Sequence, residues 1–182
     1  MAPTQKKQMW LWSTDDGVAP ITVKLPIAAS QGILMPGAPV YISQAGTVKV
    51  CDSSDGSDAW HGFLVGTADR GTTWPLTAAL AGSVDVIVQL IAPADTYAVY
   101  VDTGGTDAAS TQAMVGDQYG LTVQTSPAGL ISYTTLTTGN TNATVQVTNV
   151  IWEVEPSKHA AADSPGIALV KFLTAVVEAS KA

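Results

Sequence analysis

The sequence is poor in the residues on which disulfide-bonded, metal-binding and membrane proteins depend. Cys51 is its one cysteine, which excludes an internal disulfide and every Cys-x-x-Cys zinc or redox motif. No apolar run approaches the ~20 residues of a membrane-spanning helix. Residues 1–12 also lack the apolar core of a signal peptide. We therefore expect a protein made in a reducing cytoplasm, with no membrane as its partner.

Charge is also scarce. Only 13% of the residues are charged while 46% are hydrophobic, a balance that excludes a disordered chain. Eight basic residues stand against fifteen acidic ones, and the resulting net charge of −7 repels phosphate backbones. Nucleic acid is therefore not expected as a partner. An exterior with so little charge favours an assembly in which part of the surface is buried.

The few titratable side chains build no recognisable active site. His61 and His159 are the only imidazoles that could act as a base, and no Gly-x-Ser-x-Gly nucleophile motif occurs. Glu153 and Glu155 share one face of an expected strand, which is more typical of a solvated edge than of a glycosidase carboxylate pair. We predict no catalytic residue, no cofactor and no enzyme activity.

One cluster deserves a metal test because five possible ligands fall within eleven residues. These are Cys51, Asp52, Asp55, Asp58 and His61. An EF-hand needs acidic oxygens at alternate positions and a late glutamate, whereas here the acids recur every third residue. Zinc would need more cysteine or histidine. The pattern favours an Asp-Gly turn between strands over a metal site.

What the sequence has in quantity is β-branched residues in alternation with polar ones. The organising stretch is Ser83–Ile91 followed by Thr96–Val101, which we interpret as two strands joined by a sharp reversal at residues 92–95. Further strands are expected at residues 21–25, 39–43, 47–50, 60–66, 119–123, 131–133, 145–155 and 167–173. About ten or eleven short strands at this spacing predict an all-β antiparallel barrel or sandwich.

Three local details sharpen this prediction. Gly46 ends a Gln-Ala-Gly turn and can supply the positive φ of a hairpin between residues 39–43 and 47–50. The apolar phase of residues 145–155 shifts by one residue, which predicts a β-bulge near Thr148 and Asn149. Residues 102–112 are expected to form an exposed loop, and the last strand to fray into residues 176–177.

We divide the chain into an N-terminal arm at residues 1–19, a first barrel-like β subdomain at 20–92 and a second at 93–182. Lys6 and Lys7 lie in the first seven residues of the arm, so the sign of its N-terminal tip is opposite to that of the acidic body. If extended, the arm projects Trp10 and Trp12 to one side. These indoles either begin the first strand of the chain's own barrel and pack in its core, or dock on another subunit.

Several motifs follow one another in a suggestive order. They are Gly-x-x-x-Pro-Gly-x-Pro-Val-Tyr-Ile at residues 32–42, a turn glycine at 46, Gly-Phe-Leu-Val-Gly at 62–66 and Val-x-Val-x-Val-x-Leu at 84–90. This order resembles the small β-barrel of tailed-bacteriophage head decoration proteins, also called capsid cement. Residues 115–121 and 168–173 are similar to the second half of longer members. The resemblance covers about residues 30–175 and omits the arm.

The resemblance implies a structural virion protein on the capsid exterior. Such proteins bind the outer face of the assembled head, often as trimers, and bridge adjacent subunits of the major capsid protein. We expect Lys6, Lys7, Trp10 and Trp12 to bind a neighbouring capsid or decoration subunit. The alternative is a carbohydrate-binding or host-adhesion domain of a virion, in which an exposed Trp74 stacks on sugar rings.

Overall fold

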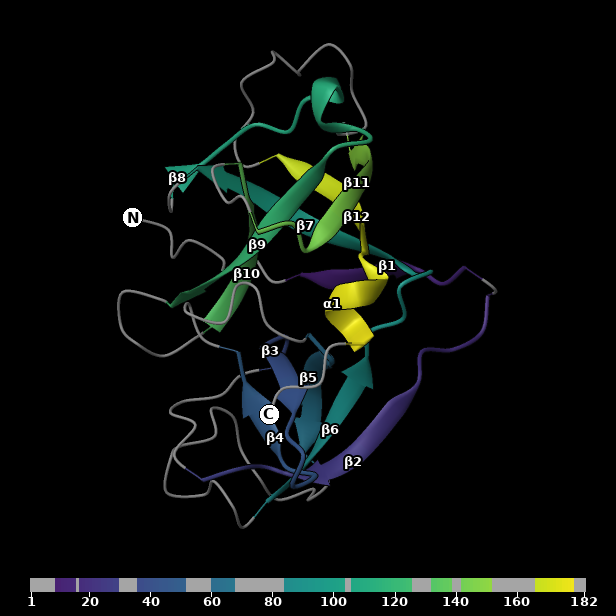
Figure 1. The fold of residues 1–182 in the computed structure, drawn as a ribbon, viewed down its shortest axis with the longest axis vertical. Coiled ribbons are helices and arrows are strands. Elements are labelled where there is room, and N and C mark those ends of the chain that lie inside the picture. Colours follow the sequence, from purple (N-terminus) through teal and green to yellow (C-terminus); the bar gives the residue numbers. More distant parts are fainter. Residues whose placement is uncertain are drawn as a thin grey trace.

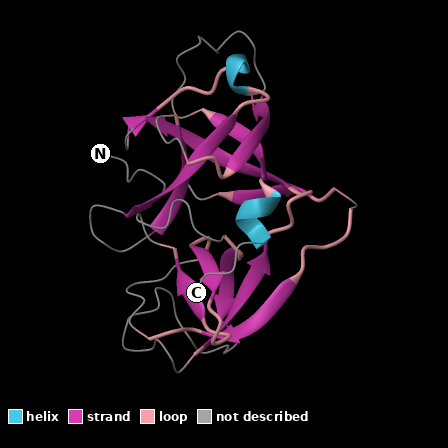
Figure 2. Ribbon diagram, in the orientation of Figure 1, coloured by secondary structure: helices cyan, strands magenta, loops and turns pink. Residues whose placement is uncertain are grey.

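The computed structural model describes residues 9–15, 17–29, 36–51, 60–67, 84–103, 106–125, 132–138, 142–151 and 166–178. Within these ranges the chain forms twelve strands, one five-residue α-helix and one 3₁₀ turn. Strands dominate the molecule in Figure 2. The predicted all-β fold is confirmed. The two sheets form two stacked units, and in Figure 1 the unit built from the later strands lies above the other.

The first sheet has the strand order β2-β6-β5-β3-β4. Its strands are β2 (Thr22–Pro26), β3 (Pro39–Ile42), β4 (Val48–Val50), β5 (Gly62–Thr67) and β6 (Asp85–Leu90). Just after β2, Ile27 forms a parallel bridge with Val48 of β4, and the Ala28 N–H donates to the Val48 carbonyl at 2.8 Å. The sheet thereby closes on itself, which protects its edges. We call this unit the first barrel.

Alternation explains why these residues close into a barrel. Val86 and Val88 of β6 are fully buried, whereas the residues between and beside them are partly exposed. The core is purely aliphatic and consists of Ile27, Ala38, Val40, Val48, Leu64, Val86 and Val88. The predicted hairpin is confirmed as β3 and β4, and Gly46 in its turn has φ +75°.

The second sheet closes into a ring of five strands, β7-β10-β9-β11-β12, because β12 also pairs with β7. Its strands are β7 (Thr96–Thr103), β9 (Gln118–Thr125), β10 (Ser132–Thr137), β11 (Val145–Ile151) and β12 (Ile167–Phe172). Four of its junctions are antiparallel, and the pairing of β7 with β10 is parallel. The two-residue β8 (Thr106–Asp107) adds to the end of β7. We call this unit the second barrel.

The predicted bulge lies where the phase shift placed it. Val147 of β11 pairs with Val170, and Asn149 pairs with the next residue of β12, Leu169. Thr148 is therefore the extra residue, and its hydroxyl donates to the Leu169 carbonyl at 3.1 Å. Because of this insertion both Val147 and Val150 are buried, which an uninterrupted strand would not allow.

The two strands with a reversal at residues 92–95 are confirmed, whereas the expected end of the last strand is corrected. The strands on either side of residues 92–95 exist, but β6 pairs with β2 and β5 while β7 belongs to the second barrel. The turn between them, in which the Asp95 N–H donates to the Ala92 carbonyl at 3.0 Å, therefore links the two barrels. After β12 the chain forms α1 (Thr174–Glu178), and Val177 packs on the core of the second barrel.

The expected exposed loop at residues 102–112 is also wrong in its first part. β7 continues to Thr103, and Asp102 is only 3% exposed. Ser110 is buried as well, and a short 3₁₀ helix, η2 (Gln112–Met114), places Met114 in the core. The composition of this stretch is typical of a loop, but the Asp102 carboxylate finds hydrogen-bond donors inside the fold.

The two barrels share the larger of the two hydrophobic cores. Four aromatic rings meet at the junction, and Phe172 lies 5.3 Å from Tyr97, 6.2 Å from Trp60 and 6.3 Å from Phe63 between ring centroids. Trp60 and Phe63 come from the first barrel, yet they belong to the core that fills the second. Trp60 is fully buried there.

Candidate interaction surface

The described part of the predicted arm forms a strand of the chain's own second barrel. β1 (Trp10–Ser13) pairs antiparallel with β7, and Met9 before it is 2% exposed within the core. Trp10 packs its ring against Tyr100 at a centroid distance of 5.7 Å. Both indoles thus lie in a strand of the chain's own barrel but not in its core, and their role in binding a partner stays a prediction. Lys6 and Lys7 lie outside the described residues, and their role in binding stays a prediction.

The two tryptophans of β1 have different surroundings. The register passes from the pair of Leu11 and Tyr97 to the pair of Ser13 and Thr96, so that Trp12 is the extra residue of a bulge. Its side chain is 52% exposed, whereas Trp10 is partly buried. Simple alternation predicts the same face for both indoles and misses this difference. Trp12 is thus the indole that remains available to a partner.

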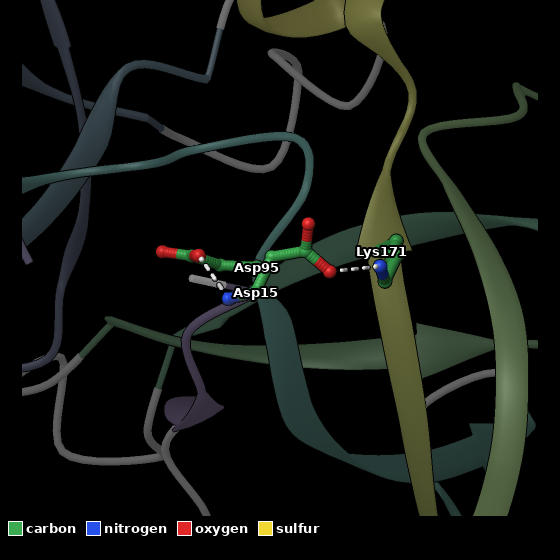
Figure 3. Close-up of polar contacts among 3 residues, drawn as sticks. All are labelled: Asp15, Asp95 and Lys171. Atoms are coloured by element: carbon green, nitrogen blue, oxygen red, sulfur yellow. Dashed lines mark hydrogen bonds and ion pairs between the residues drawn. The ribbon is translucent and has the colours of Figure 1, made fainter. Parts of the chain in front are cut away.

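Two polar contacts hold the end of β1 against the second barrel (Figure 3). The Asp15 N–H donates to Oδ1 of Asp95 at 3.2 Å, and Asp95 is 7% exposed. The Asp15 carboxylate faces the other way and lies 3.5 Å from Nζ of Lys171 on β12. Because both side chains of the ion pair are well exposed, the pair itself contributes little to stability, about 0.5 kcal/mol.

A mostly apolar groove of about 230 Å³ follows directly on this contact. The segment after Asp15 forms one wall and the link from β6 to β7 forms the other. Its lining residues are Thr14, Val18, Ala19, Pro20, Ile21, Leu90, Ile91, Ala92 and Asp95. The Leu90 N–H donates to the Ile21 carbonyl at 2.9 Å and so joins the two walls. The groove is apolar along most of its length and has a carboxylate at Asp95.

Exposed apolar side chains concentrate beside this groove. Among the described residues, the large hydrophobic side chains that are exposed are Trp12, Val18, Ile21 and Val65. Three of these four belong to residues 12–21, with Val18 at 61% and Ile21 at 68% exposure. We call Trp12, Val18 and Ile21 the N-terminal apolar segment. Single exposed apolar residues are ordinary, but here three lie within ten residues, and two of them, Val18 and Ile21, line the groove.

The other sequence-based candidates do not gather into a second site among the described residues. His61 is partly buried, and its Nδ1 accepts a hydrogen bond from the Ile42 N–H at 2.8 Å. Cys51 is buried in the shared core. Asp52, Asp55, Asp58, Trp74, Glu153, Glu155 and His159 lie outside the described residues. In the described ranges, no three His, Cys, Asp or Glu side chains lie in a group that could hold a metal ion.

One buried polar cluster was missed by the sequence analysis. Asp102 accepts hydrogen bonds from the hydroxyls of Thr135 and Thr137, at 2.7 and 2.8 Å, and all three side chains are buried. The cluster joins β7 to β10 across their parallel junction. The Thr-x-Thr pattern of β10 places two hydroxyls on the same face of the strand, which was a signal for a polar cluster. The local sequence does not identify Asp102 as the carboxylate that they bind. Its place between two ladder strands makes it a structural clamp.

Tyr97 shows how strongly the junction of the barrels excludes water. Its phenol is buried, and burial is the main reason why the pKa of Tyr97 rises from 10.0 to about 12. The Ala92 N–H donates to the phenol oxygen at 3.2 Å and opposes the rise, while the charge of Asp95 adds to it. Tyr97 therefore stays neutral and packs as an aromatic anchor against Phe63 and Phe172.

No helix in the described ranges has the length and apolar character needed to cross a bilayer. No protein-family model, curated protein or solved structure matches the chain. The N-terminal apolar segment with its groove and the motifs of the sequence are therefore the features that bear on function.

Proposed function

We propose that the chain is a structural protein of a tailed-bacteriophage head, which binds the outer face of the capsid and bridges neighbouring subunits of the major capsid protein. The observation that carries this proposal is the N-terminal apolar segment beside its groove. The motif order that resembles head decoration proteins supports it from the sequence. No catalytic step enters the proposal, because its action is adhesion through surface contact.

The surface has the chemistry expected of a docking site. Burial of apolar area releases roughly 25 cal/mol per Å², and a partly exposed tryptophan is a frequent centre of binding energy. Trp12, Val18 and Ile21 offer such area on one short stretch of chain. Lys6 and Lys7 precede it and add attraction to an acidic partner surface.

We further propose that the protein acts as a homo-oligomer, with a trimer as the expected form. A bridge between capsid subunits requires that several binding surfaces engage at the same time. Linked copies strengthen one another because, once one surface is bound, the next meets its site at high effective concentration. The low charge of the chain, 13% of all residues, also favours burial between copies.

A head-binding assay with matched variants tests this proposal. The triple variant W12A/V18S/I21S removes the N-terminal apolar segment, and V65S removes the exposed apolar side chain of β5 as a control. Co-sedimentation with empty heads should show at least about tenfold weaker binding of the triple variant, a loss typical of a central anchor. V65S should bind like the unmodified chain.

Truncation separates the arm from the strand that follows it. Deletion of residues 1–8 removes Lys6 and Lys7 but keeps Met9 in the core, whereas a longer deletion would also remove a core residue. We expect weaker and less salt-dependent head binding from this truncated chain. Unchanged binding of both the truncated chain and the triple variant would refute the surface. If the chain does not bind heads but binds sugars on a glycan array, the result would instead support a sugar-binding domain.

A further inference from the structure

β1 is an addition to a barrel that closes without it. β12 covers one edge of β7 along residues 97–100, and β10 covers the opposite edge along residues 100–102. β1 occupies the remaining part of that second edge, at residues 96–98. The ring β7-β10-β9-β11-β12 is complete in its absence. Withdrawal of β1 therefore leaves the strand ring closed, but it opens a slot beside β7 and uncovers the part of the core that Met9 and Leu11 cover.

This slot is shaped for one particular strand. Met9 enters the core, Leu11 packs against the core and Trp10 lies on Tyr100. The backbone of β7 supplies ladder partners from Thr96 to Ala98. An empty slot would expose apolar surface and unpaired backbone groups together, a combination that attracts a strand of matching sequence. The strand that matches is β1 itself.

The connector from β1 to β2 has the properties of a hinge. It leads from the second barrel to the first, and Gly17 within it has φ +70° with open space around the position of a Cβ atom. Val18 and Ile21 are exposed, so the connector is not packed as a tight closed turn. In two chains that exchange β1, the connectors run across from one copy to the other and can contact each other.

We infer that the slot on β7 accepts β1 of a second copy, so that neighbouring copies exchange their N-terminal strands. This inference rests on the homo-oligomeric part of the proposed function and names the contact that would hold the oligomer together. Exchange of an identical element reuses every contact of the single chain, and only the hinge changes. Asp15 moves with β1, so that it pairs with Lys171 and Asp95 of the neighbouring copy.

The balance between the two forms depends on concentration. Within one chain, β1 meets its slot at a high effective concentration set by the short connector. Exchange must offset this advantage through the additional contacts that the crossing connectors make with each other. Neighbouring copies on a capsid are at high local concentration, so exchange is more favourable for them than for dilute copies in solution.

An isotope experiment on the unmodified chain decides between the forms. Ordinary and heavy-nitrogen chains are unfolded, mixed in equal amounts and refolded at high concentration. A carbodiimide then joins Nζ of Lys171 to the Asp15 carboxylate, which lie 3.5 Å apart; the amide forms with loss of one water, which the reagent takes up as it becomes a urea. Exchange predicts that about half of the Asp15–Lys171 peptides carry mixed labels, because copies assort at random.

Peptides of one label only, in an oligomer, would overturn strand exchange while leaving the homo-oligomer intact. The same result with a monomer would overturn both strand exchange and the homo-oligomer. Head binding by the unmodified chain is measured separately, and its presence or absence does not alter the isotope pattern. The failure of the inference and the failure of the proposed function can therefore be told apart.

A cysteine experiment gives a second readout. In a C51A background, one chain carries S13C and the other T96C, two positions that are register partners of β1 and β7. Neither chain can form an internal disulfide, so a covalent heterodimer after mild oxidation requires β1 of one copy on β7 of the other. The control mixture carries T22C and Q89C, register partners within the first barrel. A heterodimer yield no higher than in the control overturns the exchange.

Discussion

The two barrels of this chain are built on the same plan and filled in different ways. Each closes a ring of five strands, yet the first is filled by seven small or aliphatic residues and the second by a larger core with four aromatic rings. Closure pairs the backbone of both. A ring of paired strands can therefore close around a small aliphatic core. The large aromatic side chains lie instead where the two barrels pack against each other.

The aromatic rings also show that the barrels are not independent in their packing. Cys51, Trp60, Phe63 and Ile91 precede β7 in sequence but belong to the core of the second barrel. The strands divide close to residue 92, whereas the core extends across that position. The division into subdomains at residues 20–92 and 93–182 thus stays a prediction about folding units, and the variants below test it.

The largest effect is expected from Phe172→Ala. Phe172 contacts the rings of Trp60, Phe63 and Tyr97, and loss of a buried phenylalanine costs about 3–5 kcal/mol. Hydrogen exchange should show lower protection in β6 of the first barrel as well as in β9 of the second. Leu64→Ala in the aliphatic core is the matched variant, which should affect the first barrel more. If Phe172→Ala lowers the protection of one barrel and leaves the other unchanged, the barrels are separate folding units.

Gly62→Ala probes how tightly the strands of the first barrel approach. A Cβ atom at Gly62 would overlap the Gln89 carbonyl oxygen and lie 2.6 Å from Cγ1 of Val88. We expect a loss of about 3 kcal/mol in urea unfolding, because backbone must move. Gly66→Ala on the same strand is the control, since its nearest neighbouring atom is 3.9 Å away. Equal stability of the two variants would contradict this account.

Asp102→Ala tests the polar clamp of the second barrel. The change leaves the buried hydroxyls of Thr135 and Thr137 without their acceptor and should cost about 2–3 kcal/mol. Thr148→Ala removes an exposed hydroxyl contact and should cost far less. A thermal melt of both variants measures the difference. Unchanged stability of Asp102→Ala would show that β7 and β10 need no clamp.

Alkaline pH should weaken the junction through Tyr97. Its pKa is about 12 in the folded protein and near 10 when unfolded, so the neutral phenol stabilises the fold fully below pH 10. This contribution, about 2 kcal/mol, is lost as the pH rises from 10 through 12. Urea unfolding across this range measures it. Tyr97→Phe should show a smaller decrease in stability, and an identical pH profile would exclude Tyr97 as the cause.

The smallest effect is expected at the surface of the first barrel. Lys24 of β2 and Asp85 of β6 form an ion pair at 3.2 Å, with 60% and 43% of their side chains exposed. Lys24→Ala should therefore change the free energy of unfolding by about 0.5 kcal/mol or less. A double-mutant cycle with Asp85→Ala isolates the pair. A coupling well above 1 kcal/mol would mean that this edge of the barrel depends on charge.

Much of the local structure could be predicted from patterns in the sequence. The phase shift in residues 145–155 located the bulge at Thr148, and the Gln-Ala-Gly turn located a hairpin. Both features are local, because alternation and positive φ are properties of a few adjacent residues. The fate of Asp102 was not predictable in this way, since its threonine partners are more than thirty residues away.

The N-terminal surface shows the same limit. Sequence singled out Trp10 and Trp12 as a pair, but only the register of β1 on β7 separates the stacked indole from the exposed one. The groove was not foreseen at all, because its walls are residues 14–21 and 90–95, which are far apart in sequence.

The sequence by itself determined that this chain is made of short strands, where most of them lie and which residues of each face inward, because side chains alternate along an extended backbone. Only the tertiary structure decided that both rings close, that β7 and β10 pair in parallel, and that the aromatic residues of one barrel complete the core of the other. These outcomes depend on which edges pair and which apolar faces meet. That choice is made by packing between distant segments, and no local pattern encodes it.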